Sequence, residues 1–170
     1  EYRNLLDGIE MADSYVFNPH KWMFTNFDLS AYFVKDPESL VRTFELTPEY
    51  LRTAPGGGVN YKDWGIQLGR RFRALKLWFV LRSFGLQGIR AMFRKHIALA
   101  QEFRAWVEAT TDFEPMAPTV MNVVCFRYNP GGISSAQLDE YNSRIVSHMN
   151  ESGSVYITHT RIMGRYTLRF

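Results

Sequence analysis

The first 60 residues alternate between short runs of aromatic or β-branched side chains and polar stretches. Residues 13–22 predict a strand that runs into a loop, and residues 28–35 predict a second strand. The polar stretch that follows contains three prolines and ends in the glycine run 56–58. Because adjacent glycines outside a hydrophobic pattern leave the backbone free, we expect a mobile loop over residues 46–60.

From Trp64 onward, apolar positions recur every three or four residues, which predicts helices. The first helical segment extends to the glycines at 85 and 88, and a longer helix is expected over residues 89–110. One side of this longer helix is apolar and the other carries charged residues, so we expect it to be half buried. The predicted buried stripe comprises Ile89, Met92, Phe93, His96, Ala100, Phe103 and Val107.

After Asp112 the pattern returns to strands, with one further helix. Residues 119–128 predict a strand, and the Asn-Pro-Gly-Gly sequence that follows predicts a turn. Ser134 and Ser135 are expected to cap a helix that ends near His148. The last two alternating runs, 155–160 and 165–170, predict a hairpin that turns at Met163-Gly164.

This order of elements predicts an α/β fold class with more than one part. Residues 1–88 are expected to form the end of a large α/β domain, residues 89–110 a connecting helix, and residues 111–170 a small α+β domain. We also expect the chain to be a piece of a longer protein, because it lacks an initiator methionine and stops inside a predicted strand.

Composition narrows the class of protein. With 46% hydrophobic and 15% aromatic residues, the chain has enough apolar material for a packed core, which excludes a disordered segment. Its 20 basic and 17 acidic residues leave a net charge of only +3. No uncharged run reaches the length of a membrane span and the start does not read as a signal peptide, so we expect a cytoplasmic protein with no membrane segment.

The candidate chemistry centres on Lys21. A lysine at the end of a strand is usually solvated, but Lys21 follows a strand expected to be buried and lies between Pro19 and Trp22, beside His20. Burial would favour its neutral amine, which is the form that condenses with a carbonyl group. The histidines at 96, 148 and 159 show no metal-ligand spacing, so no metal is expected.

The run Ala12–Trp22 resembles the cofactor-lysine segment of the aromatic-L-amino-acid decarboxylases, group II enzymes that depend on pyridoxal 5'-phosphate (PLP). Further blocks in the same order extend the resemblance over essentially the whole chain, most weakly between Ala109 and Met163. The most specific block is Leu68–Phe79, and the others are Asn26–Asp28, Val34–Lys35, Pro48–Leu51, Tyr61–Trp64 and Leu168–Phe170. The resemblance implies a fold-type-I, PLP-dependent transferase-like fold and a homodimer with active sites at the subunit interface.

The resemblance also implies roles for individual residues. Lys21 would carry PLP, with His20 and Asn18 lining the cofactor or, alternatively, only holding the turn. Tyr50, on a loop that closes over the site, would donate the proton that replaces CO₂ on the substrate. Relatives that form aldehydes tend to carry phenylalanine in place of this tyrosine.

Three further residues are implied to contact the substrate. Phe27 and Gly69 would border the pocket for the aromatic ring, and the small residue at 69 is a hint of indole rather than phenol substrates. Arg169 would hold the substrate carboxylate or brace the site, the alternative being an ordinary salt bridge on a strand. The family's aspartate that pairs with the pyridinium nitrogen and its ring-stacking histidine would precede this chain, so the chain alone is predicted to be inactive.

Two further functions stay open on the sequence. The first is a sibling decarboxylase acting on histidine, glutamate or sulfinoalanine, which the Leu68–Phe79 block disfavours. The second is a basic helical binding module without catalysis, because the segment from Arg70 to Lys76 combines four cations with the aromatic Phe72. Their spacing distributes them around a helix, so we expect them to anchor that helix or a dimer contact, and no nucleic-acid partner is expected.

Overall fold

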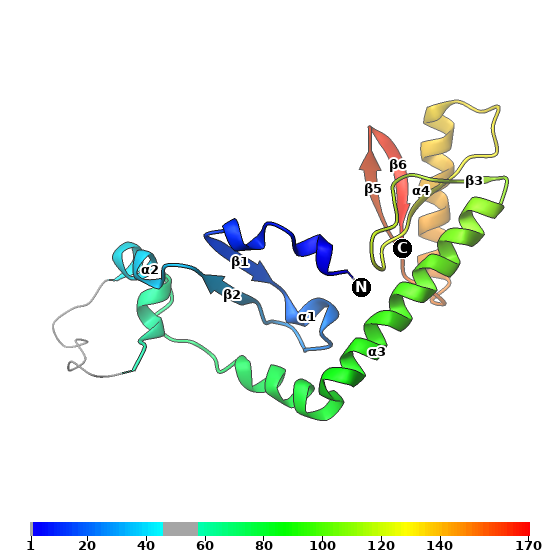
Figure 1. Ribbon diagram of the computed structural model, residues 1–170. Coiled ribbons are helices and arrows are strands. Elements are labelled where there is room, and N and C mark those ends of the chain that lie inside the picture. The colour runs from blue at the N-terminus through cyan, green and yellow to red at the C-terminus, as the bar shows by residue number, and fades with distance from the viewer. Residues whose placement is uncertain (1, 46–57) are drawn as a thin grey trace. The chain divides into compact units, whose positions relative to one another are not determined.

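The computed structural model describes residues 2–45 and 58–170 of the chain (Figure 1). The chain divides into two compact units, Glu1–Leu86 and Gln87–Phe170, called here the N-terminal unit and the C-terminal unit. Within the described residues, no helix combines the length and the apolar character needed to cross a bilayer.

A two-stranded antiparallel sheet organises the N-terminal unit. Strand β1 (Ser14–Phe17) pairs with β2 (Ala31–Val34), so that Ser14 lies opposite Val34 and Phe17 opposite Ala31. Two short 3-10 helices, η1 (Arg3–Leu6) and η2 (Ile9–Met11), precede β1. Both predicted strands are confirmed, each over four residues.

Two segments expected to be irregular are helical. Residues 19–22 form a short helix, α1 (Pro19–Trp22), because Pro19 presets the backbone at its first position. The polar stretch contains α2 (Pro37–Phe44), which starts with a proline in the same way and is capped by Asp36, whose carboxylate accepts the Glu38 N–H at 3.0 Å. A 3-10 turn, η4 (Tyr61–Trp64), follows.

The prediction of a helix from Trp64 is wrong for its first ten residues. Helix α3 (Ala74–Ala109) begins only at Ala74, since Gly65 and Gly69 lower the helix propensity of the preceding segment. Gly85 has a left-handed φ of 64° that interrupts α3, as the glycine pattern indicated. Beyond it, Ile89, Ala100 and Val107 of the predicted stripe are buried, and Ile97 joins them.

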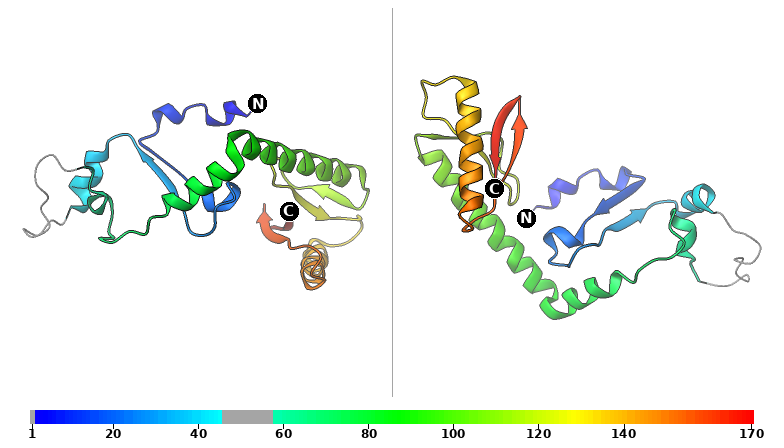
Figure 2. Two further views of the ribbon diagram at one scale, coloured as in Figure 1. Left: turned by 90° about the horizontal axis from the view of Figure 1, so that it is seen from below. Right: turned by 180° about the vertical axis from the view of Figure 1, so that it is seen from behind.

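The C-terminal unit is built on a four-stranded antiparallel sheet in the order β3-β4-β6-β5. Its elements are β3 (Phe113–Pro115), β4 (Cys125–Tyr128), α4 (Ser135–Glu151), β5 (Thr158–Ile162) and β6 (Arg165–Arg169). Figure 2 shows α4, in orange, beside the red β5–β6 hairpin. The ring of Phe126 on β4 packs edge-on against Phe103 of α3, with the centroids 5.2 Å apart. This contact belongs to one buried core made of Ala100, Val107, Val124, Phe126, Val146, Ile157, Tyr166 and Leu168.

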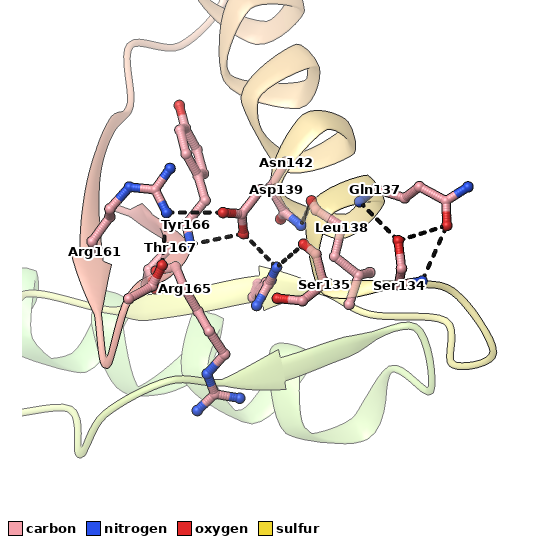
Figure 3. Close-up of polar contacts among 12 residues, drawn as sticks. Ser134, Ser135, Gln137, Leu138, Asp139, Asn142, Arg161, Arg165, Tyr166 and Thr167 are labelled. Carbon is pink, nitrogen blue, oxygen red and sulfur yellow. Dashed lines mark hydrogen bonds and ion pairs between the residues drawn. The ribbon is translucent and has the colours of Figure 1, made fainter.

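Sequence and structure agree well in this unit. Ser134 caps α4 through a reciprocal capping box with Gln137 (Figure 3), although the helix ends at Glu151 rather than His148. The predicted hairpin is confirmed, and Met163 and Gly164 at its turn both have positive φ, as a type I′ turn requires. The strand expected over residues 119–128 is wrong in extent, because only β4 forms and a separate three-residue β3 pairs with it.

One carboxylate joins the helix to three strands of the C-terminal unit (Figure 3). Asp139 on α4 accepts hydrogen bonds from Arg127 on β4 at 2.6 Å, Arg161 on β5 at 2.8 Å and the backbone N–H of Tyr166 on β6 at 3.0 Å. Burial raises the pKa of Asp139, but the Tyr166 N–H and the two guanidinium groups outweigh it and hold that pKa below its usual range. Arg127 is only 1% exposed, so Asp139 neutralises a charge that has almost no access to water.

Candidate active site

The turn that carries Lys21 has a fixed backbone, and the Lys21 side chain is exposed to solvent. Pro19 is fully buried, and the Lys21 N–H donates to the Asn18 carbonyl oxygen at 2.9 Å, which fixes the backbone of the turn. The Lys21 side chain is exposed and forms no hydrogen bond or ion pair with any described residue. The expectation that this lysine is buried among the residues present is therefore wrong. The structure presents a free primary amine on a fixed turn.

His20 connects this turn to the segment that precedes β2. Its Nδ1 lies 2.6 Å from the carbonyl oxygen of Leu29 and 2.9 Å from the amide nitrogen of the same residue, and the tautomer decides which of the two it binds. The imidazole also meets the ring of Phe27 edge-on at 5.0 Å. Nδ1 is therefore engaged in holding the turn, whereas Nε2 has no hydrogen-bond partner among the described residues.

Asn18 forms a second connection across the same turn. Its Oδ1 accepts a hydrogen bond from the Ser30 hydroxyl at 2.6 Å, while its Nδ2 donates to no described residue. Asn18 and His20 thus both hold the turn, one of the two roles that the sequence left open. Each also leaves one polar nitrogen available to a ligand.

An ion cluster that the sequence did not reveal lies next to these residues. The Asp28 carboxylate pairs with Arg71, and its Oδ2 accepts a hydrogen bond from Nε of Arg73 at 3.2 Å and lies 3.2 Å from Nη2 of the same guanidinium. The hydrogen bond from Arg73 is the main reason that the pKa of Asp28 lies below its usual range. Arg71 and Arg73 therefore precede α3 and bind Asp28, which corrects their assignment to the surface of a helix. No local signal indicates a pair separated by 43 to 45 residues in sequence.

Two candidate pocket residues adjoin this cluster in sequence. Phe27 directly precedes Asp28, and its side chain is 83% exposed. Gly69 lies two residues before Arg71, and a Cβ built on it would meet no atom within 4 Å. Nothing among the described residues thus prevents either position from facing a ligand. Tyr50 lies outside the described residues.

Arg169 belongs to the C-terminal unit. It ends β6, opposite Cys125 of β4 and Thr158 of β5, and its side chain is exposed. Among the described residues Arg169 forms no ion pair, so the salt bridge that the sequence offered as its alternative role is not observed. Its guanidinium remains available for a carboxylate.

Comparison with known proteins identifies the family. Residues 1–129 match the pyridoxal-dependent decarboxylase conserved domain. The whole chain is 41% identical to tyrosine decarboxylase 1 of Narcissus pseudonarcissus, covering 35% of it, and 41% identical to phenylacetaldehyde synthase of Petunia hybrida, covering 36% of it. A crystal structure of Oryza sativa TDC with PLP and tryptamine superposes with a TM-score of 0.93 at 35% identity, over 99% of this chain and 36% of that one.

The chain therefore belongs to the pyridoxal-dependent decarboxylase family, and the resemblance noted in its sequence is confirmed. The solved structures also confirm the fold-type-I, PLP-dependent class of the fold. The chain spans about a third of the length of these relatives.

The residues of the turn fit the PLP cofactor of this family. PLP attaches to proteins through the primary amine of a lysine, and Lys21 offers such an amine without a competing partner among the described residues. The phosphate and ring of PLP need hydrogen-bond donors and acceptors, and Nε2 of His20 and Nδ2 of Asn18 are free within the same part of the chain. Together these three residues can provide part of a PLP site.

Proposed function

We propose that the full-length protein is a PLP-dependent decarboxylase that converts aromatic L-amino acids of the DOPA, tyrosine or tryptophan type into amines and CO₂. The observation that carries this proposal is the free Lys21 amine on a braced turn, in a chain 41% identical to a tyrosine decarboxylase. We also propose that the protein is a cytoplasmic homodimer.

The proposal assigns parts of a larger active site to this chain. Residues 1–88 would form the end of the PLP-binding large domain, residues 89–110 the connecting helix, and residues 111–170 the small domain. Bound PLP would supply a sink for the electron pair that remains when CO₂ leaves the substrate. Lys21 would hold the cofactor through its amine, and the substrate amine would displace that amine from the cofactor. His20 and Asn18 would bind polar groups of the cofactor.

The remaining candidates would act on the substrate. Phe27 and Gly69 would border its aromatic ring, and Arg169 would bind its carboxylate through two parallel hydrogen bonds. Tyr50 would donate a proton to the substrate Cα after CO₂ has left, and its loop would exclude water during that step. In this scheme the chain binds the substrate, orients it and returns a proton to one carbon.

An aldehyde-forming activity is the second candidate function. The Petunia phenylacetaldehyde synthase is as similar to the chain as the Narcissus tyrosine decarboxylase, since each is 41% identical. Overall identity therefore does not separate the two reactions. Tyr50 favours amine formation, because a phenol can supply the Cα proton whereas the phenylalanine expected in aldehyde-forming relatives has no acidic hydrogen.

A sibling specificity and a nucleic-acid-binding role receive less support. Decarboxylases of histidine, glutamate or sulfinoalanine would need a polar substrate pocket, which the exposed ring of Phe27 does not favour. A basic nucleic-acid-binding module would need free cations over residues 70–76, but Arg71 and Arg73 are already paired with Asp28. Binding to nucleic acid would also give the free amine of Lys21 no particular role.

The test uses the full-length protein. Reduction with borohydride should fix the cofactor covalently, and peptide mapping should find the pyridoxyl group on Lys21. Assays of CO₂ and amine with tyrosine, DOPA, tryptophan, phenylalanine, histidine, glutamate and sulfinoalanine should then show activity confined to the aromatic substrates. A colourless protein, a label on Lys35 or Lys76, or a preference for glutamate would each contradict the proposal.

A further inference from the structure

Two exposed phenylalanines in the N-terminal unit are held in place by one ion cluster. Phe27 is 83% exposed and Phe72 is 75% exposed, although most phenylalanines in proteins are buried. Phe27 directly precedes Asp28, and Phe72 lies between Arg71 and Arg73. The three charged residues, called here the Asp28 clamp, pair with one another and so restrain the backbone beside both rings.

The backbone at Phe72 explains how two arginines reach one carboxylate. The Arg73 N–H donates to the Arg71 carbonyl oxygen at 2.8 Å, a hydrogen bond between residues i and i+2 that defines a γ-turn centred on Phe72. This turn brings Arg71 and Arg73 to the same carboxylate, one on each oxygen. The same segment contains Gly69, four residues before Arg73.

A second set of contacts also restrains Phe27. Leu29, two residues later, is buried and bound to Nδ1 of His20, and the His20 ring meets Phe27 edge-on. These contacts restrict the Phe27 ring and the backbone that follows it, but they do not bury the ring among the described residues. A ring ordered in this way offers a ligand a pre-positioned contact, which avoids the entropy that is otherwise lost on ordering.

The clamp itself contributes little to folding. The side chains of Asp28, Arg73 and Arg71 are 32%, 34% and 72% exposed, and ion pairs with this much access to water add little to stability. The effect of the clamp is to fix the relative position of two segments that lie 43 to 45 residues apart in sequence. A fork of two guanidinium groups on one carboxylate fixes orientation better than a single contact.

We propose that Asp28, held by Arg71 and Arg73, is a positioning residue that sets the preference of the enzyme among aromatic rings. It does so by fixing Phe27 relative to the segment that contains Gly69 and Phe72. The inference rests on the proposed function, since it requires a substrate ring to lie against these residues. The clamp touches neither substrate nor cofactor and acts only through the positions of its neighbours.

The test compares variants of the full-length holoenzyme. Asp28→Asn removes the charge but keeps the size, and Asp28→Glu keeps the charge but lengthens the side chain. Asp36→Asn is the matched control, because Asp36 is also an exposed aspartate paired with an arginine, Arg42 at 3.1 Å. For each variant, kcat and KM are measured separately with tyrosine and tryptophan, together with borohydride-trapped cofactor and the melting temperature.

Asp28→Asn should raise KM and change the tyrosine-to-tryptophan ratio of kcat/KM by ~10-fold or more, because misplacing a binding group by about 1 Å can cost ~10²-fold. Trapped cofactor and melting temperature should stay at wild-type values, and Asp36→Asn should leave the ratio unchanged. Arg73→Met should reproduce the effect, and adding it to Asp28→Asn should cost little more, since both remove the same contact. Asp28→Glu should restore part of the ratio.

Two results would overturn the inference. The first is an unchanged ratio in both Asp28→Asn and Arg73→Met. The second is a loss of cofactor or folding in Asp28→Asn that Asp28→Glu repairs without any change in the ratio, which would make the clamp purely structural. A wild-type enzyme inactive on every aromatic substrate would instead contradict the proposed function, so the two failures are distinguishable.

Discussion

The two units of the chain bury their apolar side chains to very different degrees. The C-terminal unit has a core of eight buried residues drawn from α3, α4 and the sheet. In the described part of the N-terminal unit, the buried side chains are Pro19, Thr25 and Leu29, while the two strands expose Tyr15, Val16, Tyr32 and Phe33. The residues proposed for chemistry thus lie mostly in the unit with little core of its own.

This difference indicates two ways of holding a structure together. The C-terminal unit is stabilised by apolar burial, which is the main favourable contribution to folding. Around Lys21 the described contacts are polar connections, from His20 to Leu29, from Asn18 to Ser30 and from Asp28 to two arginines. A two-stranded sheet is marginal by itself, so we expect the exposed apolar residues beside it to pack against further protein in the full-length chain.

The largest expected effect is on chemistry in the N-terminal unit. In the full-length protein, Lys21→Ala should abolish amine formation and the borohydride-trapped adduct, because the residue proposed to hold the cofactor is lost. The melting temperature measured without cofactor should not change, since the Lys21 side chain has no partner among the described residues. Lys35→Ala, which removes another exposed lysine, is the control and should keep full activity.

The next effect concerns one oxygen atom at Tyr50. Tyr50→Phe should leave cofactor binding and CO₂ release largely intact, while the rate of amine formation falls ~10²- to 10⁴-fold, as is typical for the loss of one positioned acid. Aldehyde, ammonia and hydrogen peroxide should appear instead, at a rate that rises with dissolved oxygen. Amine formation at nearly the wild-type rate would remove Tyr50 from the proposed mechanism.

Local signals explain most of what the sequence predicted correctly. The cap at Ser134, the turn at Met163-Gly164 and the buried stripe of α3 each depend on residues within a few positions of one another. Strand β1 before Lys21 was predicted in the same way, although residues 19–22 form a short helix rather than the expected loop. Local signals therefore located the strands that flank this turn, whereas Lys21 was singled out by the family resemblance.

The errors share a different cause. Strand β3 is three residues long and forms only because it pairs with β4, and residues 70–73 leave the helical pattern where Arg71 and Arg73 bind Asp28. The connections of His20 and Asn18 likewise join residues 9 and 12 positions apart. Such contacts depend on tertiary structure, which hydrophobic periodicity does not encode.

In the C-terminal unit the largest expected effect is on stability. Asp139→Ala should destabilise this unit by ~3–5 kcal/mol, because it leaves the buried charge of Arg127 without its partner. Hydrogen exchange of the amides in β4 and β6 reports this loss locally in the full-length protein. Replacing Arg127 and Asp139 together by methionine and leucine should recover most of it. The control is Glu114→Gln, which alters a partly exposed pair with Arg165 at 3.8 Å and should cost little.

The same carboxylate gives this unit a defined response to acid. The pKa of Asp139 is lower when the unit is folded than when it is unfolded, so its contribution is complete above the unfolded value of about 3.9. That contribution is lost as the pH falls through the lower, folded value. Protection of the β4 and β6 amides should therefore decrease below about pH 4 in the wild type. In Asp139→Asn this decrease should be smaller, and an identical acid profile would contradict the linkage.

The smallest expected effect is the loss of a helix cap. It compares the two units most directly, because the same change can be made in each. Ser134 caps α4 and Asp36 caps α2, each through a side-chain oxygen that accepts a backbone N–H, at 3.3 Å and 3.0 Å respectively. Replacing either cap by alanine should cost about 1 kcal/mol of helix stability.

The two losses should spread differently. Helix α4 contributes Val146 to the core of the C-terminal unit, so Ser134→Ala should lower amide protection in β4 and β6 as well as in α4 itself. Helix α2 buries no residue, so Asp36→Ala should increase exchange within α2 and leave β1 and β2 unchanged. Hydrogen exchange on both variants measures this contrast. If the loss of amide protection spread equally far in the two units, α2 would belong to a cooperative core. The distinction between a unit stabilised by apolar burial and one held by polar contacts would then be wrong.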